Sequence, residues 1–163
     1  MRLTPIYTVC LSALLCLTLT ACGFHLRETN KLPDKFQQVS LVGIDFDQAL
    51  GKALRVAFID ARSELVVAGR KATTQLQISN LEEGQRVASF ASDLSVRQYL
   101  LYLLFDYKIV VDGKVVATQR VRLDKTMNYD ADYILGKQEE ERQIRKSLRE
   151  DAARLILLRM RSL

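Results

Sequence analysis

The chain has 163 residues, of which 48% are hydrophobic and 26% are charged, and its formal net charge is +5. This composition is ordinary for one globular domain and excludes a collagen-like, disordered or multi-span membrane protein. The positive charge is mild and is not concentrated in a basic tail, so the sequence gives no support to nucleic-acid binding.

The first 21 residues have the pattern of a secretory signal peptide. Arg2 supplies a positive start, and residues 6–19 are apolar except for Thr, Ser and Cys. The stretch is too short to cross a bilayer as a helix. It ends in Leu-Thr-Ala-Cys at residues 19–22, which resembles the lipobox of bacterial lipoproteins and implies cleavage before Cys22 and acylation of that cysteine. An ordinary signal peptide that leaves Cys22 free is the alternative.

Cleavage at this site would define both the redox chemistry and the location of the mature protein. It removes Cys10 and Cys16, so no disulfide can form and stability must come from core packing. Several acyl chains on Cys22 would hold the domain on a membrane permanently, since each buried methylene contributes about 0.8 kcal/mol. Gly23 stands where lipoproteins of the inner membrane commonly have Asp, which implies the outer membrane and its periplasmic face.

The mature chain begins with a tether and continues as one domain. We interpret residues 22–35 as the lipid anchor and a polar tether, and residues 36–163 as a single domain. Residues 36–44 are rich in β-formers and predict a strand, which is followed by a helix over 45–61 with Asp45 as its cap. Two further strands are expected, over 64–68 and 73–79, and the order strand, helix, strand suggests a right-handed crossover.

Two long β-rich stretches, 94–111 and 115–129, flank Asp112-Gly113-Lys114 and predict a hairpin. One straight strand of the first stretch would reach about 60 Å at roughly 3.3 Å per residue, so the hairpin must bend, bulge or project. A two-residue loop would mix Arg120 and Arg122 with the aromatic side chains. We prefer a three-residue loop, which pairs Asp106 with Arg120. Its core face then holds Tyr99, Leu101, Leu103, Phe105, Tyr107, Ile109, Ala117, Val121 and Leu123.

Residues 99–105 are apolar on both sides of the predicted strand. One side can pack on the helices of the domain, and the other is either covered by this chain or offered to a partner. The candidates for contact with a partner are Tyr99, Leu101, Leu103 and Phe105. Burial of both sides within a two-layer core is the alternative.

The last element is an amphipathic helix over 132–161, with Asp130 or Asp132 as its cap. Pairs of opposite charge at a spacing of four residues, Glu141–Arg145 and Glu150–Arg154, support it.

The sequence contains no pattern that predicts catalysis, a metal site or a cofactor. Phosphate loops and the motifs GxSxG, HExxH and CxxC are missing, and His25 is the only histidine. The acidic runs at 82–83 and 139–141 are typical of a solvated surface. We therefore expect a protein that is not an enzyme.

Three cations are candidates for binding an anionic amphiphile beside residues 99–105. Arg120 and Arg122 project from one face of a strand, and Lys137 lies in the first turn of the last helix, where free N–H groups favour phosphate. Arginine can hold phosphate through two parallel hydrogen bonds. Each cation taken alone is better explained as a solvated surface charge.

The run CGFHLR at residues 22–27 resembles the start of the mature lipoproteins of the LptE (RlpB) family. The segment YILGKQE at 133–139 resembles the family segment that enters the last helix, and the order of predicted elements is similar as well. The resemblance implies an α+β fold of two helices on a mixed, mostly antiparallel sheet of four to five strands. It also implies a plug inside the outer-membrane barrel LptD, which binds lipopolysaccharide and assists its passage to the outer leaflet.

Carried over to this sequence, the resemblance makes Cys22 the acylation site and Lys137 a contact to lipopolysaccharide. The family also has a basic residue before the long strand, where this chain has residues 90–93 with Arg86 and Arg97 nearby. Our leading hypothesis is thus a non-enzymatic plug that binds lipopolysaccharide. The alternative is a structural lipoprotein that chaperones barrel folding without contacting lipid.

Overall fold

The computed structural model describes residues 31–69, 72–129 and 134–163. The expected signal peptide at 1–21, the acylation site Cys22, and the two proposed caps Asp130 and Asp132 lie outside these ranges. Within them, a short 3-10 helix η1 (Asp34–Phe36) precedes five strands and two helices. No helix in the described ranges is both long enough and apolar enough to cross a membrane.

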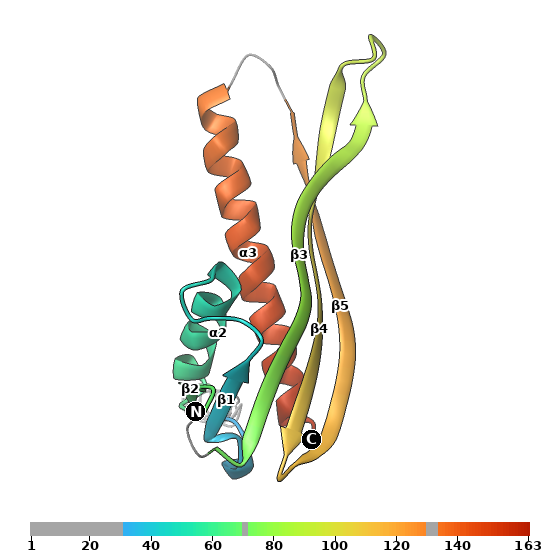
Figure 1. Cartoon of the computed structure of the whole chain (residues 1–163). Helices are drawn as coiled ribbons and strands as arrows, with labels where there is room; N and C mark the ends of the chain where they lie inside the picture. The colour runs from blue at the N-terminus through green and yellow to red at the C-terminus, as the bar shows by residue number, and fades with distance from the viewer. Residues whose placement is uncertain (1–30, 70–71, 130–133) are drawn as a thin grey trace, which may run out of the picture.

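The five strands form one mixed sheet with the order β2-β1-β3-β4-β5. The strand β1 (Gln38–Val42) lies between β2 (Glu64–Val67) and β3 (Thr74–Phe90) and is parallel to both. The strands β4 (Val96–Val111) and β5 (Lys114–Asn128) continue the sheet in antiparallel fashion. Helices α2 (Ala49–Asp60) and α3 (Ile134–Arg161) lie on one face of this sheet (Figure 1). The expected fold class is confirmed.

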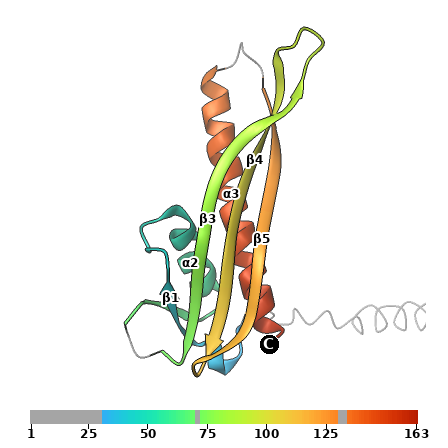
Figure 2. The same cartoon turned by 45° about the vertical axis from the view of Figure 1, so that its right-hand side comes forward.

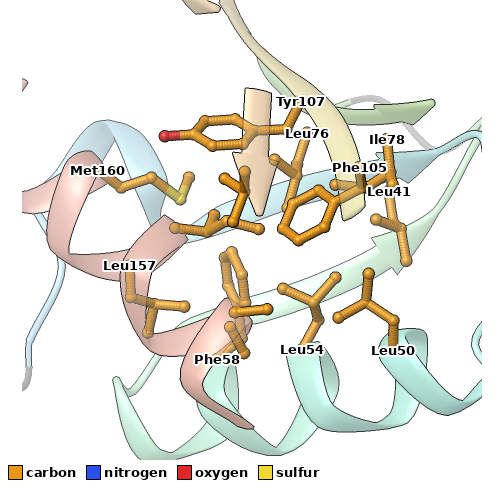
Figure 3. Packing of buried hydrophobic residues seen from close by; sticks show 14 of the residues in the cluster. Leu41, Leu50, Leu54, Phe58, Leu76, Ile78, Phe105, Tyr107, Leu157 and Met160 are labelled. Atoms are coloured by element: carbon orange, nitrogen blue, oxygen red, sulfur yellow. The ribbon is translucent and has the colours of Figure 1, made fainter. Parts of the chain in front are cut away.

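The core lies between the sheet and the two helices at the end of the molecule that contains β1, β2 and α2. Figure 3 shows Leu50, Leu54 and Phe58 of α2 pointing toward Phe105 and Leu76 of the sheet. Helix α3 closes the same space with further buried side chains, including Leu157 and Met160. Burial of these apolar side chains is the main contribution to stability, at about 1.5–3 kcal/mol for each large one.

The β4–β5 hairpin has the preferred register but a shorter loop than expected. Asp112 and Gly113 form a two-residue turn with φ of 49° and 77°, which is the left-handed geometry that suits a tight hairpin. A bulge then follows, because Val110 pairs with Val115 whereas Ile109 pairs with Ala117. The extra residue restores the pairing of Asp106 with Arg120 along the rest of the hairpin.

Strand β3 is much longer than the expected strand over 73–79. It continues to Phe90 after an irregularity between Ser79 and Glu82, where Asn80 has φ of 53°. The upper part of β3 pairs with β4, and the two strands curve together and project past the end of α3 (Figures 1 and 2). The long strand expected from the sequence therefore both bends and projects.

The predicted start of the first helix is wrong. Helix α2 begins at Ala49, and Gln48 is its N-cap residue, without a side-chain cap hydrogen bond. The carbonyl oxygen of Asp45 accepts a hydrogen bond from the Gln48 N–H at 3.2 Å, which makes a turn before the helix. In α3, Glu141 and Arg145 pair as expected, whereas Arg154 lies 3.6 Å from Asp151 rather than against Glu150.

Candidate functional site

A projecting turn joins β3 to β4, and we call residues 90–96 the hairpin tip. The strand β5 ends at Asn128, which pairs with Gln98, so only β3 and β4 continue toward the tip. Asp93 accepts hydrogen bonds from the Ser95 N–H (3.0 Å) and hydroxyl (2.6 Å), and these bonds hold the pKa of Asp93 below its usual range. These hydrogen bonds fix the conformation of the turn, although β5 does not extend far enough to support it.

The hairpin tip exposes apolar side chains. Leu94 is 82% exposed and Phe90 is 60% exposed. Leu94 also has φ of 64°, a left-handed conformation that is costly for a side chain of this kind. Both views show the tip beyond the end of α3 (Figures 1 and 2).

Lys137 lies between two tyrosine rings below the hairpin tip, and we call Lys137, Tyr99 and Tyr129 the aromatic corner. The Lys137 ammonium is 3.8 Å from the ring centre of Tyr129 and 5.1 Å from that of Tyr99. The rings meet edge to face, 5.4 Å apart and at 86°. The Tyr129 N–H donates a hydrogen bond to the Arg97 carbonyl oxygen at 2.9 Å, which fixes Tyr129 beside β4. The corner thus holds a partly buried positive charge in a defined place.

Arg120 and Arg122 lie elsewhere, on the face of the sheet that is turned away from the helices. Arg120 makes two hydrogen bonds to Asp106, at 2.8 and 3.2 Å, and these hold the pKa of Asp106 below its usual range. Arg122 is exposed, and its Nε is 3.8 Å from Asp124. The structure therefore does not bring the three expected cations together, because Lys137 lies on the helix side of the sheet.

Three of the four candidates for partner contact are core residues. Leu101, Leu103 and Phe105 are buried on the helix side of β4, and Tyr99 on the same side is partly buried. Contact with a partner through the three buried side chains would require the helix layer to move away. For this side of β4 the structure thus shows the core packing that was the alternative. Because β4 is apolar on both sides, composition alone does not distinguish its two faces.

The outward-facing side chains of β4 form what we call the outer strip, Leu100, Tyr102 and Leu104, all of which are partly exposed. The Tyr102 ring lies against Gly84, where a Cβ atom would be 2.6 Å from the nearest ring carbon. The Tyr102 hydroxyl donates a hydrogen bond to Glu82 at 2.6 Å, which raises the pKa of Tyr102.

Two arginines border the outer strip. Arg86 is paired with Leu100 and Arg122 with Leu104 in the neighbouring strands. Arg86 and Arg97, the two cations near the position where the family has a basic residue, thus lie in different places. Arg86 borders the outer strip, and Arg97 is an exposed residue of β4 next to the hairpin tip.

Sequence reasoning missed Tyr129 and the apolar tip. Tyr129 follows the last residue of β5, and only the fold places its ring under Lys137. Phe90 and Leu94 are isolated apolar residues in a polar stretch, and such residues give no periodic signal.

Comparison with known proteins adds to this geometry. The family model described as "LptE: Lipopolysaccharide-assembly" matches residues 36–160. The LPS-assembly lipoprotein LptE of Pectobacterium atrosepticum is 24% identical over 140 residues, which are 85% of this chain and 76% of that protein.

Solved structures share the fold. The solution structure of an uncharacterized lipoprotein B from Nitrosomonas europaea has a TM-score of 0.68 at 24% identity and covers 83% of this chain and 88% of its own. The crystal structure of rare lipoprotein B from Shewanella oneidensis has a TM-score of 0.65 at 22% identity. The match covers 77% of this chain and 94% of that protein's chain. At this level of identity the structural likeness establishes the architecture alone.

Proposed function

The chain belongs to the LptE family of lipopolysaccharide-assembly lipoproteins, which are not enzymes, and from that membership we propose that it binds lipopolysaccharide at the aromatic corner. We further propose that it acts as the plug and assembly partner of the barrel LptD. In this role it assists the insertion of lipopolysaccharide into the outer leaflet.

The observation that carries the lipid proposal is the position of Lys137 beside an apolar projection. Its ammonium is held by Tyr99 and Tyr129, and the residue paired with Tyr99 in β3 is Val87, three residues before Phe90. A fixed cation next to exposed apolar groups suits an anionic amphiphile, whose phosphate and hydrocarbon parts need both. The first turn of α3 adds the positive end of the helix dipole.

The partner proposal rests on the outer strip. The helices cover the opposite face of the sheet, whereas Leu100, Tyr102 and Leu104 remain partly exposed on this one. Arg86 and Arg122 border these apolar side chains. A partly apolar surface with charged groups at its border is typical of a protein interface, so we assign this face to contact with LptD.

The proposed location follows from Cys22. We propose that residues 1–21 are removed and that the acylated cysteine anchors residues 22–35 and the domain at the periplasmic side of the outer membrane. The described chain starts at Lys31, only nine positions after Cys22. Several acyl chains would make this attachment stable.

Charge reversal at the aromatic corner tests the function. In the full chain, Lys137→Glu should weaken lipopolysaccharide binding about tenfold or more, because hydrogen bonds to charged groups contribute about 1.5–3 kcal/mol. Lys146→Glu, at an exposed lysine of the same helix, is the matched control and should bind like the wild type. The amount of lipopolysaccharide retained by each immobilised protein is measured, and copurification of each protein with LptD is measured in parallel.

Two outcomes would contradict the proposal. Unchanged lipopolysaccharide binding by folded Lys137→Glu would exclude the aromatic corner as the lipid site. If LptD still copurified with that variant and the wild type bound no lipid, the protein would be a chaperone of barrel folding that does not contact lipid.

A further inference from the structure

The hairpin tip presents apolar side chains that the described fold does not use for its own core. Leu94, Phe90 and Val87 are 82%, 60% and 41% exposed. Phe90 and Leu94 belong to the part of the β3–β4 pair that extends beyond the last paired residue of β5, whereas Val87 lies at its base, opposite Tyr99. Exposed apolar groups that cluster on a projection mark an interaction site, whereas single ones on a flat surface do not.

The conformation of Leu94 supports the same interpretation. Its φ of 64° lies in the left-handed region, where glycine, asparagine and aspartate are the usual residues. Backbone hydrogen bonds hold the turn, from the Leu94 N–H to Ala91 (3.0 Å) and from the Ala91 N–H to Ser95 (2.8 Å). A leucine at this apex therefore adds strain while its side chain remains in solvent. Folding alone does not explain its presence.

The surroundings indicate what covers these side chains. The aromatic corner lies at the base of the projection, since Tyr99 pairs with Val87. From this pair to Phe90 the strand advances about 10 Å, at roughly 3.3 Å per residue. Lys137 lies in the corner at the base, and exposed Arg97 of β4 lies between the corner and the hairpin tip. The order from base to tip is thus cationic and then apolar, which is complementary to a molecule with an anionic head and hydrocarbon tails.

We propose that Phe90 and Leu94 insert among the acyl chains of the lipopolysaccharide whose anionic head contacts Lys137. This inference rests on the proposed function and adds a second contact, to the hydrocarbon part of the same ligand. It divides recognition into two regions, with Lys137 contacting the head and the hairpin tip contacting the tails.

The test uses two ligands that differ only in their acyl chains, intact lipopolysaccharide and the fully deacylated molecule. The double variant Phe90→Ser with Leu94→Ser, made in the full chain, should bind intact lipopolysaccharide about tenfold more weakly than the wild type and the deacylated molecule equally well. Lys137→Ala should weaken binding of both ligands. Val56→Ser, at an exposed valine of α2 (59% exposed), is the control for loss of an exposed apolar side chain.

A second variant separates this effect from unfolding. Asparagine adopts left-handed backbone angles more readily than leucine, so Leu94→Asn should keep or raise the thermal midpoint while weakening binding of intact lipopolysaccharide. A loss of binding without a loss of stability supports the proposal.

The outcomes distinguish the two proposals. If Lys137→Ala weakens binding and both tip variants bind intact lipopolysaccharide like the wild type, the tip inference alone fails. If neither Lys137→Ala nor the tip variants alter binding, the proposed lipid site itself fails. If the tip variants bind lipid normally but no longer copurify with LptD, the tip contacts protein and the assignment to acyl chains is overturned.

Discussion

Lys137 contacts the faces of two tyrosine rings, one in β4 and one just after β5. Tyr99 lies in β4 and Tyr129 directly follows β5, so the ammonium position depends on the sheet as well as on α3. A cation–π contact contributes about 0.5–2 kcal/mol, depending on its exposure to water. The rings are therefore expected to position the charge for its ligand.

Substitution of Tyr129 tests this positioning. Tyr129→Leu removes the ring and should weaken lipopolysaccharide binding about threefold or more, whereas Tyr129→Phe keeps the ring and should bind like the wild type. In a Lys137→Ala background, Tyr129→Leu should have no further effect. An equal loss in the Leu and Phe variants would show that the hydroxyl, and not the ring, is what matters.

The Asp106–Arg120 pair predicts a dependence on pH. The hydrogen bonds from Arg120, and then that from Asn80, hold the pKa of Asp106 below its usual value of about 3.9. Because the folded-state pKa is depressed, the stabilisation by this pair is complete above the unfolded pKa. It is lost as the pH falls through the folded one.

Titration of the Asp106 carboxyl carbon by NMR measures this shift. Its midpoint should lie below that of an ordinary aspartate and should rise toward about 3.9 in Arg120→Ala. The carboxyl group is on the surface, so the effect on overall stability should be small. An identical midpoint in the two proteins would contradict the assignment.

At the scale of elements, the sequence predicts those whose apolar residues have a clear period. Leu50, Leu54 and Phe58 recur at helical spacing, and α2 and α3 follow from such patterns. The extension of β3 through residues 80–90 has no such signal, because both of its sides are largely polar and an irregularity follows Ser79. This part is a strand because β4 is available to pair with it, and pairing between distant segments is not encoded locally.

The candidate site is predicted less well than the fold. The position of Lys137 at the start of a helix and the resemblance both point to it, but its neighbours come from elements that are distant in sequence. Arg120 and Arg122 share a face as expected, yet the sheet separates them from Lys137. When both faces of a strand are apolar, the position of the helices decides which face is buried. The composition of the strand alone does not determine this.

Two helical glycines predict opposite effects of the same substitution. Glycine to alanine within a helix usually stabilises by about 1 kcal/mol, and Gly136→Ala in α3 should do so because nothing lies within 4 Å of the new Cβ. At Gly51 in α2 a Cβ would lie 2.2 Å from the Asp45 carbonyl oxygen. Gly51→Ala should therefore destabilise, by about 1–3 kcal/mol, as expected of overpacking.

Urea unfolding of both variants measures these changes in the free energy of unfolding. A stabilising Gly51→Ala would mean that the turn before α2 moves away from the helix easily.

At the scale of the whole molecule, support for the sheet decreases toward the hairpin tip. The lower part has five strands with two helices packed on it, whereas β3 and β4 alone reach residues 90 and 96 (Figure 1). Local opening requires less free energy where few buried apolar contacts must be broken. A two-stranded segment without a packed face is only marginally stable in water.

Native-state hydrogen exchange should follow this gradient. Amides of residues 96–98 in β4 should exchange faster than those of residues 101–107, which belong to the buried part of the same strand. Bound lipopolysaccharide should slow exchange at the tip if the acyl chains cover it. Uniform protection along β4 in the free protein would contradict the expected gradient.

The last residue lies at the end of the molecule remote from the hairpin tip. The Leu163 carbonyl oxygen accepts a hydrogen bond from Lys35 at 2.8 Å, which places the C-terminus beside the beginning of the described chain. A fluorescent reporter or affinity label fused after Leu163 would therefore emerge next to Lys35, near the beginning of the described chain. It would leave the far end of the protein unobstructed, whereas one inserted at residues 91–95 would sit on the surface that we assign to lipid.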